Sequence, residues 1–194
     1  MPSPTRFLTI LAPVLLGAAC KDQPDPPPAD AASPAQGLLP AAEFATGCGD
    51  GGELDVTLYG ALEGPVRWGA GAMSCEGMPR PDGAGARLRF AGQPDGGPPL
   101  AIIIGIPGLT RGATGTDLAS NVTIIEEGAG RFFSTTNLDT CWTDVDGQDA
   151  VDDAGRFAVR GRLICISPLP EVNGAASVTL GELRFQGFID WESS

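Results

Sequence analysis

The stretch RFAVRGRLICI, residues 156–166, decides the fold class of this chain. The apolar or small residues at positions 157, 159, 161, 163 and 165 alternate with Ala158, Arg160 and Arg162. Successive side chains of an extended strand point to opposite faces of a sheet. The stretch is therefore predicted to be a β-strand with one face in a core and one face in water.

The same period of two recurs through residues 41–194. Residues 54–60, 86–90 and 183–191 alternate in the same way, and residues 100–106 are apolar on both faces, which is typical of a central strand. Further candidate strands are residues 65–69, 72–76, 121–126, 131–136 and 139–145. Glycine, proline and aspartate separate these segments, and no segment has a helical period. The sequence predicts an all-β fold: a single antiparallel β-sandwich, or a barrel-like domain.

The N-terminal segment predicts export. An apolar run from Phe7 to Ala19 follows Arg6 and contains thirteen residues, with Pro13 in its middle. A helix of that length spans roughly 20 Å, against a hydrocarbon core of about 30 Å, so the run is short for a spanning helix. A basic residue, a short apolar run and then small residues are typical of a secretory signal, here residues 1–19.

The residues LGAAC, Leu16–Cys20, end this segment and resemble the lipobox of bacterial lipoproteins. The match departs from the usual pattern in one place, because Gly17 stands where leucine is common. The resemblance implies that Cys20 becomes the mature N-terminus and carries acyl chains, and two or more chains anchor a protein stably to a bilayer. An ordinary secretory signal, with a free or disulfide-bonded Cys20, is the alternative.

Residues 20–40 are predicted to be a disordered linker rich in proline and alanine. Such segments extend by about 3.1 Å per residue. Lys21, rather than an aspartate, follows Cys20, and by resemblance this favours the outer membrane over the inner membrane of a bacterial cell envelope. Residues 41–194 then form one domain.

Four cysteines lie in this domain, and an even number in an exported chain predicts two disulfides. The segment DVDGQDAVDDAG, residues 144–155, is predicted to be the loop of a hairpin centred near residues 152–154. Cys141 and Cys165 lie symmetrically about that centre, so they are predicted to pair, and Cys48–Cys75 follows by exclusion. A four-thiolate zinc site is the alternative, but the sequence has neither a CxxC spacing nor a histidine.

Composition excludes several kinds of chemistry. The chain has no histidine, which rules out Ser-His-Asp and Cys-His catalysis, and its single lysine, Lys21, lies outside the domain. With 12 basic and 24 acidic side chains the formal net charge is −12, so we expect no nucleic-acid partner. The remaining candidate catalytic groups are carboxylates, but the sequence does not show that two of them lie close together. We therefore expect no catalytic residue, and we also expect no cofactor.

The acidic hairpin loop is the candidate metal site. It holds five aspartates, Asp144, Asp146, Asp149, Asp152 and Asp153, and dense oxygen ligands suit Ca²⁺. The EF-hand spacing is absent, because Gln148 occupies position five and no glutamate closes the loop. A solvated hairpin loop, in which aspartate and glycine supply turn geometry, is the preferred interpretation.

Trp142 is the candidate ligand-binding residue. It is predicted to lie on the sheet face opposite Cys141, where its ring can stack on a sugar beside acidic groups, or else pack under a loop.

Two hypotheses for the function of the whole chain follow. The first is a non-enzymatic, membrane-anchored lipoprotein with a role in binding, adhesion or envelope structure and an unknown protein or glycan partner. The alternative is a carbohydrate-binding or carboxylate-based glycan-active module on the same anchor.

Overall fold

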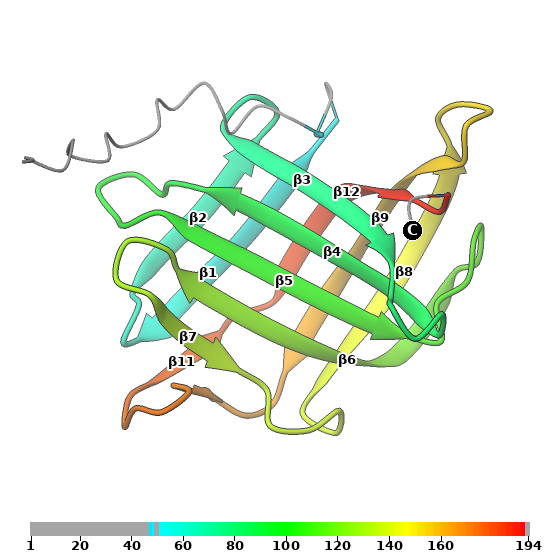
Figure 1. Ribbon diagram of the computed structural model, residues 1–194. Helices are drawn as coiled ribbons and strands as arrows, with labels where there is room; N and C mark the ends of the chain where they lie inside the picture. The colour runs from blue at the N-terminus through cyan, green and yellow to red at the C-terminus, as the bar shows by residue number, and fades with distance from the viewer. Residues whose placement is uncertain (1–46, 49–50, 193–194) are drawn as a thin grey trace, which may run out of the picture. The chain divides into compact units, whose positions relative to one another are not determined.

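The computed structural model describes residues 47–48 and 51–192, which fall within one compact unit, Leu39–Ser194. These residues form an all-β domain (Figure 1). The predicted antiparallel all-β class is thus confirmed. The predicted signal peptide (1–19) and the linker (20–40), including Cys20, lie outside the described residues. In the described part of the chain, no helix is long and apolar enough to cross a membrane.

Twelve strands are present in the described residues. They are β1 (Glu53–Gly60), β2 (Gly64–Gly69), β3 (Met73–Pro79), β4 (Gly85–Gly92), β5 (Leu100–Pro107), β6 (Gly115–Glu126), β7 (Arg131–Ser134), β8 (Cys141–Ala150), β9 (Arg156–Cys165), β10 (Leu169–Pro170), β11 (Ser177–Leu180) and β12 (Leu183–Asp190).

The strands form one hydrogen-bonded path, and every pairing in it is antiparallel. The order is β10-β11-β1-β12-β9-β8-β6-β5-β4-β3, with β2 beside β1 and β7 beside β6. The path does not close, because β3 and β10 lie at its two ends. The domain therefore takes the predicted sandwich form rather than the barrel-like alternative.

The long strand β6 joins the two layers of this sandwich. Its first half pairs with β8 and its second half, Asn121–Glu126, pairs with β5. In Figure 1, β3, β4, β5 and β6 form the front layer, and β1, β12, β9 and β8 cross behind it. One strand thus belongs to both sheets, and each layer needs the other to cover its apolar face.

The core lies between the layers and consists of the inward residues of both. Phe90 on β4 and Phe185 on β12 meet across the interface with ring centroids 5.9 Å apart. Ile102, Ile104 and Phe133 are fully buried. Burying a large apolar side chain contributes about 1.5–3 kcal/mol, so these contacts are the main source of stability.

The β8–β9 hairpin has the predicted register at its base. Cys141 is opposite Cys165, and the two form a disulfide with a Cα–Cα distance of 4.1 Å. The second predicted disulfide, Cys48–Cys75, is also present and links the start of the described chain to β3. Both disulfide predictions are confirmed. Because all four sulfur atoms are in disulfides, the alternative of a four-thiolate zinc site is excluded.

The extent of the hairpin loop was predicted wrongly. β8 continues to Ala150, and the connection to β9 comprises only residues 151–155. The extension is possible because β8 has a bulge between Val145 and Gly147. Beyond the bulge β8 pairs with β9 again, in a register shifted by one residue. Strict alternation along the sequence does not reveal such an insertion.

Candidate functional site

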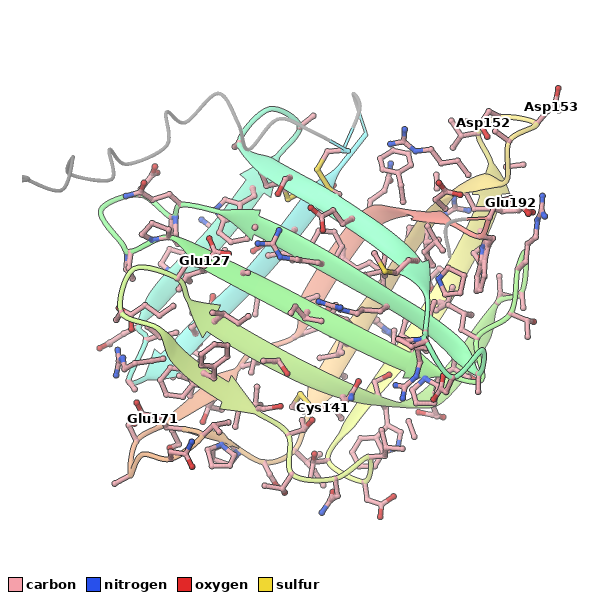
Figure 2. All side chains as sticks on the ribbon, in the orientation of Figure 1. Glu127, Cys141, Asp152, Asp153, Glu171 and Glu192 are labelled. Carbon is pink, nitrogen blue, oxygen red and sulfur yellow. A yellow bond between two sulfur atoms is a disulfide. The ribbon has the colours of Figure 1, made fainter. Side chains whose placement is uncertain are left out.

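The five aspartates proposed as calcium ligands do not gather into one site. Asp144, Asp146 and Asp149 belong to strand β8, whereas Asp152 and Asp153 belong to the turn. Figure 2 shows Asp152 and Asp153 at the tip of the hairpin, with Cys141 at the other end of β8. Over residues 47–48 and 51–192, no group of three or more potential metal-ligating side chains is found.

Three of these aspartates have other partners. The carboxylate of Asp144 accepts hydrogen bonds from Arg162, and that of Asp149 accepts one from Arg160. Asp152 Oδ1 accepts the backbone N–H groups of Ala154 and Arg156 at 3.0 and 3.1 Å. The carboxylates thus form cross-strand ion pairs and a turn cap, and calcium ligation is not supported.

Gln148 has a structural role that the sequence did not indicate. The bulge turns its side chain inward, where it is 8% exposed. Its Nε2 donates to the carbonyls of Thr110 and Ala113 at 2.9 and 2.6 Å, and its Oε1 accepts from Gly112 N at 3.3 Å and Trp191 Nε1 at 3.1 Å. One buried amide therefore fastens the β5–β6 loop and the end of β12 to strand β8.

A hollow of about 150 Å³ lies on the outer face of the sheet beside Trp142. We call it the Trp142 hollow; it is lined by Asp117, Trp142, Asp144, Arg162 and Ile164. Trp142 is partly buried, while Cys141 beside it in the chain is fully buried, as expected for opposite faces of one strand. Cross-strand pairing places Trp142 between Ala119 of β6 and Ile164 of β9.

Asp117 forms the edge of this hollow through an irregularity in β6. The pairing of β6 with β8 shifts register between Gly115 and Leu118, and Asp117 has a φ of 53°. Aspartate tolerates the left-handed region better than most residues. The backbone N–H of Asp117 donates to Asp144 Oδ1 at 2.8 Å, so the bulge and the hollow are fixed by the same carboxylate.

Asp144 is kept ionised by its neighbours. The hydrogen bond from the Asp117 backbone N–H, and then the one from Arg162, lower the pKa of Asp144 below its ordinary value of 3.8. The side chain of Asp144 is 17% exposed, and Arg162 NH2 lies 2.7 Å from its Oδ2. A carboxylate in this state accepts hydrogen bonds near neutral pH and is a poor proton donor.

We predict a pH-dependent contribution of Asp144 to stability. Because the folded-state pKa is lowered, the contribution is complete above the unfolded value of 3.8 and is lost as the pH falls through the lower folded value. Urea unfolding of the wild type and of Asp144→Asn from pH 7 to pH 2 should show a difference in unfolding free energy that shrinks below about pH 4.

The matched control is Asp153→Asn, which removes one negative charge from the exposed hairpin tip. Asp153 has no hydrogen bond or ion pair with the described residues, so this variant tests the effect of net charge alone. A wild-type-minus-Asp144→Asn difference that stayed constant down to pH 2 would contradict the prediction.

A second hollow, of about 260 Å³, lies on the outer face of β4, β5 and β6. Its lining includes Arg80, Arg87, Gly105, Asn121 and Thr123. Arg80 pairs with Asp82 at 3.2 Å, whereas the exposed Arg87 has no ion pair with any described residue.

The remaining arginines of the alternating strands are engaged. Arg89 pairs with Glu127 at 2.7 Å, and Arg160 and Arg162 pair with aspartates of β8. Salt bridges thus occupy part of the outer faces of the two layers, and exposed pairs of this kind contribute about 0–1 kcal/mol each.

Comparison with protein-family models, with curated proteins and with solved structures finds no match for this chain. Conclusions about its function therefore depend on its own residues.

Proposed function

We propose that this chain is a non-enzymatic lipoprotein of the bacterial cell envelope, in which acylated Cys20 holds a rigid binding domain beside a membrane. The observation that carries the proposal concerns the cysteines. All four cysteines of the domain pair with one another, in Cys48–Cys75 and Cys141–Cys165. Cys20 therefore has no disulfide partner within its own chain, and acylation at the lipobox-like segment gives its thiol a role.

The remaining features of the chain agree with this proposal. Two or more acyl chains give stable anchoring, and the proline-rich linker, residues 20–40, provides reach from the bilayer. Lys21 next to the anchor favours the outer membrane. The domain has two disulfides, which suit an oxidising compartment outside the cytoplasm.

The anchor is tested in a bacterium that processes lipoproteins. Membrane-associated wild type should yield a first peptide that begins at Cys20 and carries the mass of the attached lipid. We expect Cys20→Ala to move to the soluble fraction, because a chain without acyl groups has no stable attachment. Lys21→Ala is the matched control and should remain membrane-bound. An unmodified first peptide, or Cys20→Ala still sedimenting with membranes, would refute the proposal.

A second candidate function is carbohydrate binding at the Trp142 hollow. This hollow combines an aromatic ring, a carboxylate fixed in its charged form and the guanidinium of Arg162. Ligand sites commonly pair an apolar surface with a few fixed polar groups, and charged groups make strong hydrogen bonds to hydroxyls. The lowered pKa of Asp144 disfavours a role as general acid, so the hollow is better suited to binding a glycan than to cleaving it.

Calorimetry with chitotetraose, a soluble tetramer of N-acetylglucosamine, tests this second function. We expect Trp142→Ala to weaken binding at least tenfold, as truncation of a central aromatic anchor commonly does. Trp191→Phe is the matched control, because Trp191 is bonded to Gln148 rather than placed in the hollow. Absence of binding heat with the wild type, or equal affinity in Trp142→Ala, would exclude this sugar as a ligand of the hollow.

A further inference from the structure

The hollow of about 260 Å³ on the outer face of β4, β5 and β6 has two arginines and no carboxylate in its lining. We call it the Arg87 hollow. The sheet face that carries it is turned toward the viewer in Figure 1, and it shares no lining residue with the Trp142 hollow. The chain as a whole has a formal net charge of −12. A basic hollow therefore stands out against an acidic molecule.

The strand register explains the shape of the Arg87 hollow. Arg87 of β4 is opposite Gly105 of β5, which in turn is opposite Asn121 of β6. Directly paired residues of antiparallel strands lie on the same face, so a residue without a side chain separates the arginine from the amide. A Cβ at Gly105 would lie only 2.0 Å from Asn121 Oδ1. Gly105 thus forms a floor, and Asn121 borders it on one side.

Arg80 reaches the same floor from the turn that follows β3. Its Nε and NH2 donate to the two carboxylate oxygens of Asp82 at 3.3 and 3.2 Å. Asp82 is itself fixed, because its Oδ1 also accepts the Ala84 backbone N–H at 3.1 Å. The third nitrogen of the guanidinium, NH1, has no hydrogen bond with the described residues and lies 3.4 Å from the position of a Cβ at Gly105. Asp82 therefore orients Arg80 and leaves NH1 available above the floor.

Arg87 supplies a positive charge that the fold does not balance. It is exposed, and its guanidinium has no ion pair or hydrogen bond with any residue the structure describes. In the next row of the sheet, Arg89 lies opposite Glu76 and pairs with it at 3.7 Å, and it pairs with Glu127 at 2.7 Å. The acidic groups of that row are thus engaged. Because Asp82 balances Arg80, the hollow has one uncompensated positive charge.

We infer that the Arg87 hollow binds a small organic monoanion whose carboxylate accepts hydrogen bonds from Arg87 and from Arg80 NH1. A guanidinium is a planar fork that matches the two oxygens of a carboxylate. One uncompensated charge suits a carboxylate better than a phosphate group, which carries a charge of about −1.5 to −2 at pH 7. The Debye length is about 8 Å at physiological ionic strength, so distant acidic side chains have little effect on this preference.

The rest of the lining indicates the body of the ligand. Pro81 and the half-buried Ile103 add apolar surface beside the two arginines. The volume is slightly below the range of about 300–1,000 Å³ that is common for pockets of drug-sized molecules. A single ring with one carboxylate is therefore an appropriate size. Since Arg87 and Pro81 are exposed, such a ligand reaches the hollow without any movement of the chain.

The inference is tested with benzoate and benzamide, which have nearly the same shape but differ in charge. Titration of benzoate into the purified, oxidised chain labelled with ¹⁵N should shift the Arg87 Nε–H resonance saturably. Benzoate should bind at least about tenfold more tightly than benzamide, because hydrogen bonds between charged groups are stronger than those to a neutral amide. Phenyl phosphate should bind no more tightly than benzoate, because the hollow has one uncompensated charge.

Three variants separate this site from a general effect of charge. Arg87→Gln removes the uncompensated charge, so the preference for benzoate over benzamide should fall to about onefold. Arg184→Gln is the matched control: it removes an exposed arginine of β12 that pairs with Glu182 at 2.8 Å, and the preference should remain. Gly105→Ala keeps every charge but adds a methyl group to the floor, where the exposed Asn121 side chain can yield to it, and it should weaken benzoate binding several fold.

Four results would overturn the inference. They are an unmoved Arg87 Nε–H resonance, equal binding of benzoate and benzamide by the wild type, a preference that survives Arg87→Gln, and tighter binding of phenyl phosphate than of benzoate. The first, second and fourth are measured on the wild type, so they decide even if a variant fails to fold.

Discussion

Replacing Gly77 with alanine is expected to lower the free energy of unfolding by about 3 kcal/mol, the upper part of the usual range for overpacking. Gly77 lies in β3, and a Cβ at this position would be 2.0 Å from the Phe188 carbonyl oxygen and 3.0 Å from Ile189 Cα. Both atoms belong to the backbone of β12, in the opposite layer. The added methyl can be accommodated only if the two strands move apart.

The matched control is Gly69→Ala, because Gly69 is also a strand residue and a Cβ there would have no atom within 4 Å. Alanine in place of an unrestrained glycine reduces the entropy of the unfolded chain and stabilises by about 0.4–1 kcal/mol where its conformation is permitted. The two variants should therefore change stability in opposite directions in urea unfolding. A Gly77→Ala variant as stable as Gly69→Ala would show that β3 and β12 are not in close contact.

This contact also explains why the sequence did not distinguish a sandwich from a barrel. Alternation in residues 86–90, 156–166 and 183–191 depends only on each strand's own two faces, and the structure confirms those strands. Closure of the sheet into a barrel depends instead on whether its edge strands form hydrogen bonds with each other. β3 approaches β12 at Gly77 without joining it in the hydrogen-bonded path. A glycine in a strand pattern is consistent with such an approach, but it does not identify the partner.

The hairpin shows where sequence reasoning was sufficient and where it failed. Symmetry about the predicted centre paired Cys141 with Cys165 correctly, although the bulge lies between this pair and the turn. Above the bulge the pairing shifts by one residue, and segments expected to be loop become strand. Asp144 and Asp149 were interpreted as loop residues because they lie in a segment rich in aspartate and glycine. In the structure they belong to β8 and pair with Arg162 and Arg160 of β9.

The candidate sites were less predictable than the strands. Trp142 was identified from its place opposite Cys141, yet Asp117 joins it only through the bulge in β6. Gln148 had one available signal, since it is the only amide in an otherwise acidic segment.

Removing the Cys141–Cys165 disulfide, by replacing both cysteines with alanine, is expected to cost about 3 kcal/mol of unfolding free energy in the chain-entropy model. The two residues are 24 apart in sequence, so the bond restricts a sizeable loop of the unfolded chain. In the folded state they already face each other across a hydrogen-bonded hairpin. The effect should therefore arise mainly in the unfolded ensemble.

Urea unfolding distinguishes this origin from a loss of native contacts. An unfolded chain without the cross-link exposes more surface, so the m-value should rise while the midpoint falls. The Cys48→Ala/Cys75→Ala variant is the matched comparison, because its sequence separation of 27 closes a loop of almost the same length. The chain-entropy model predicts nearly equal losses for the two double variants. A much larger loss for Cys141 and Cys165, with an unchanged m-value, would instead place the stabilisation in the packing of the fully buried Cys141 against the core.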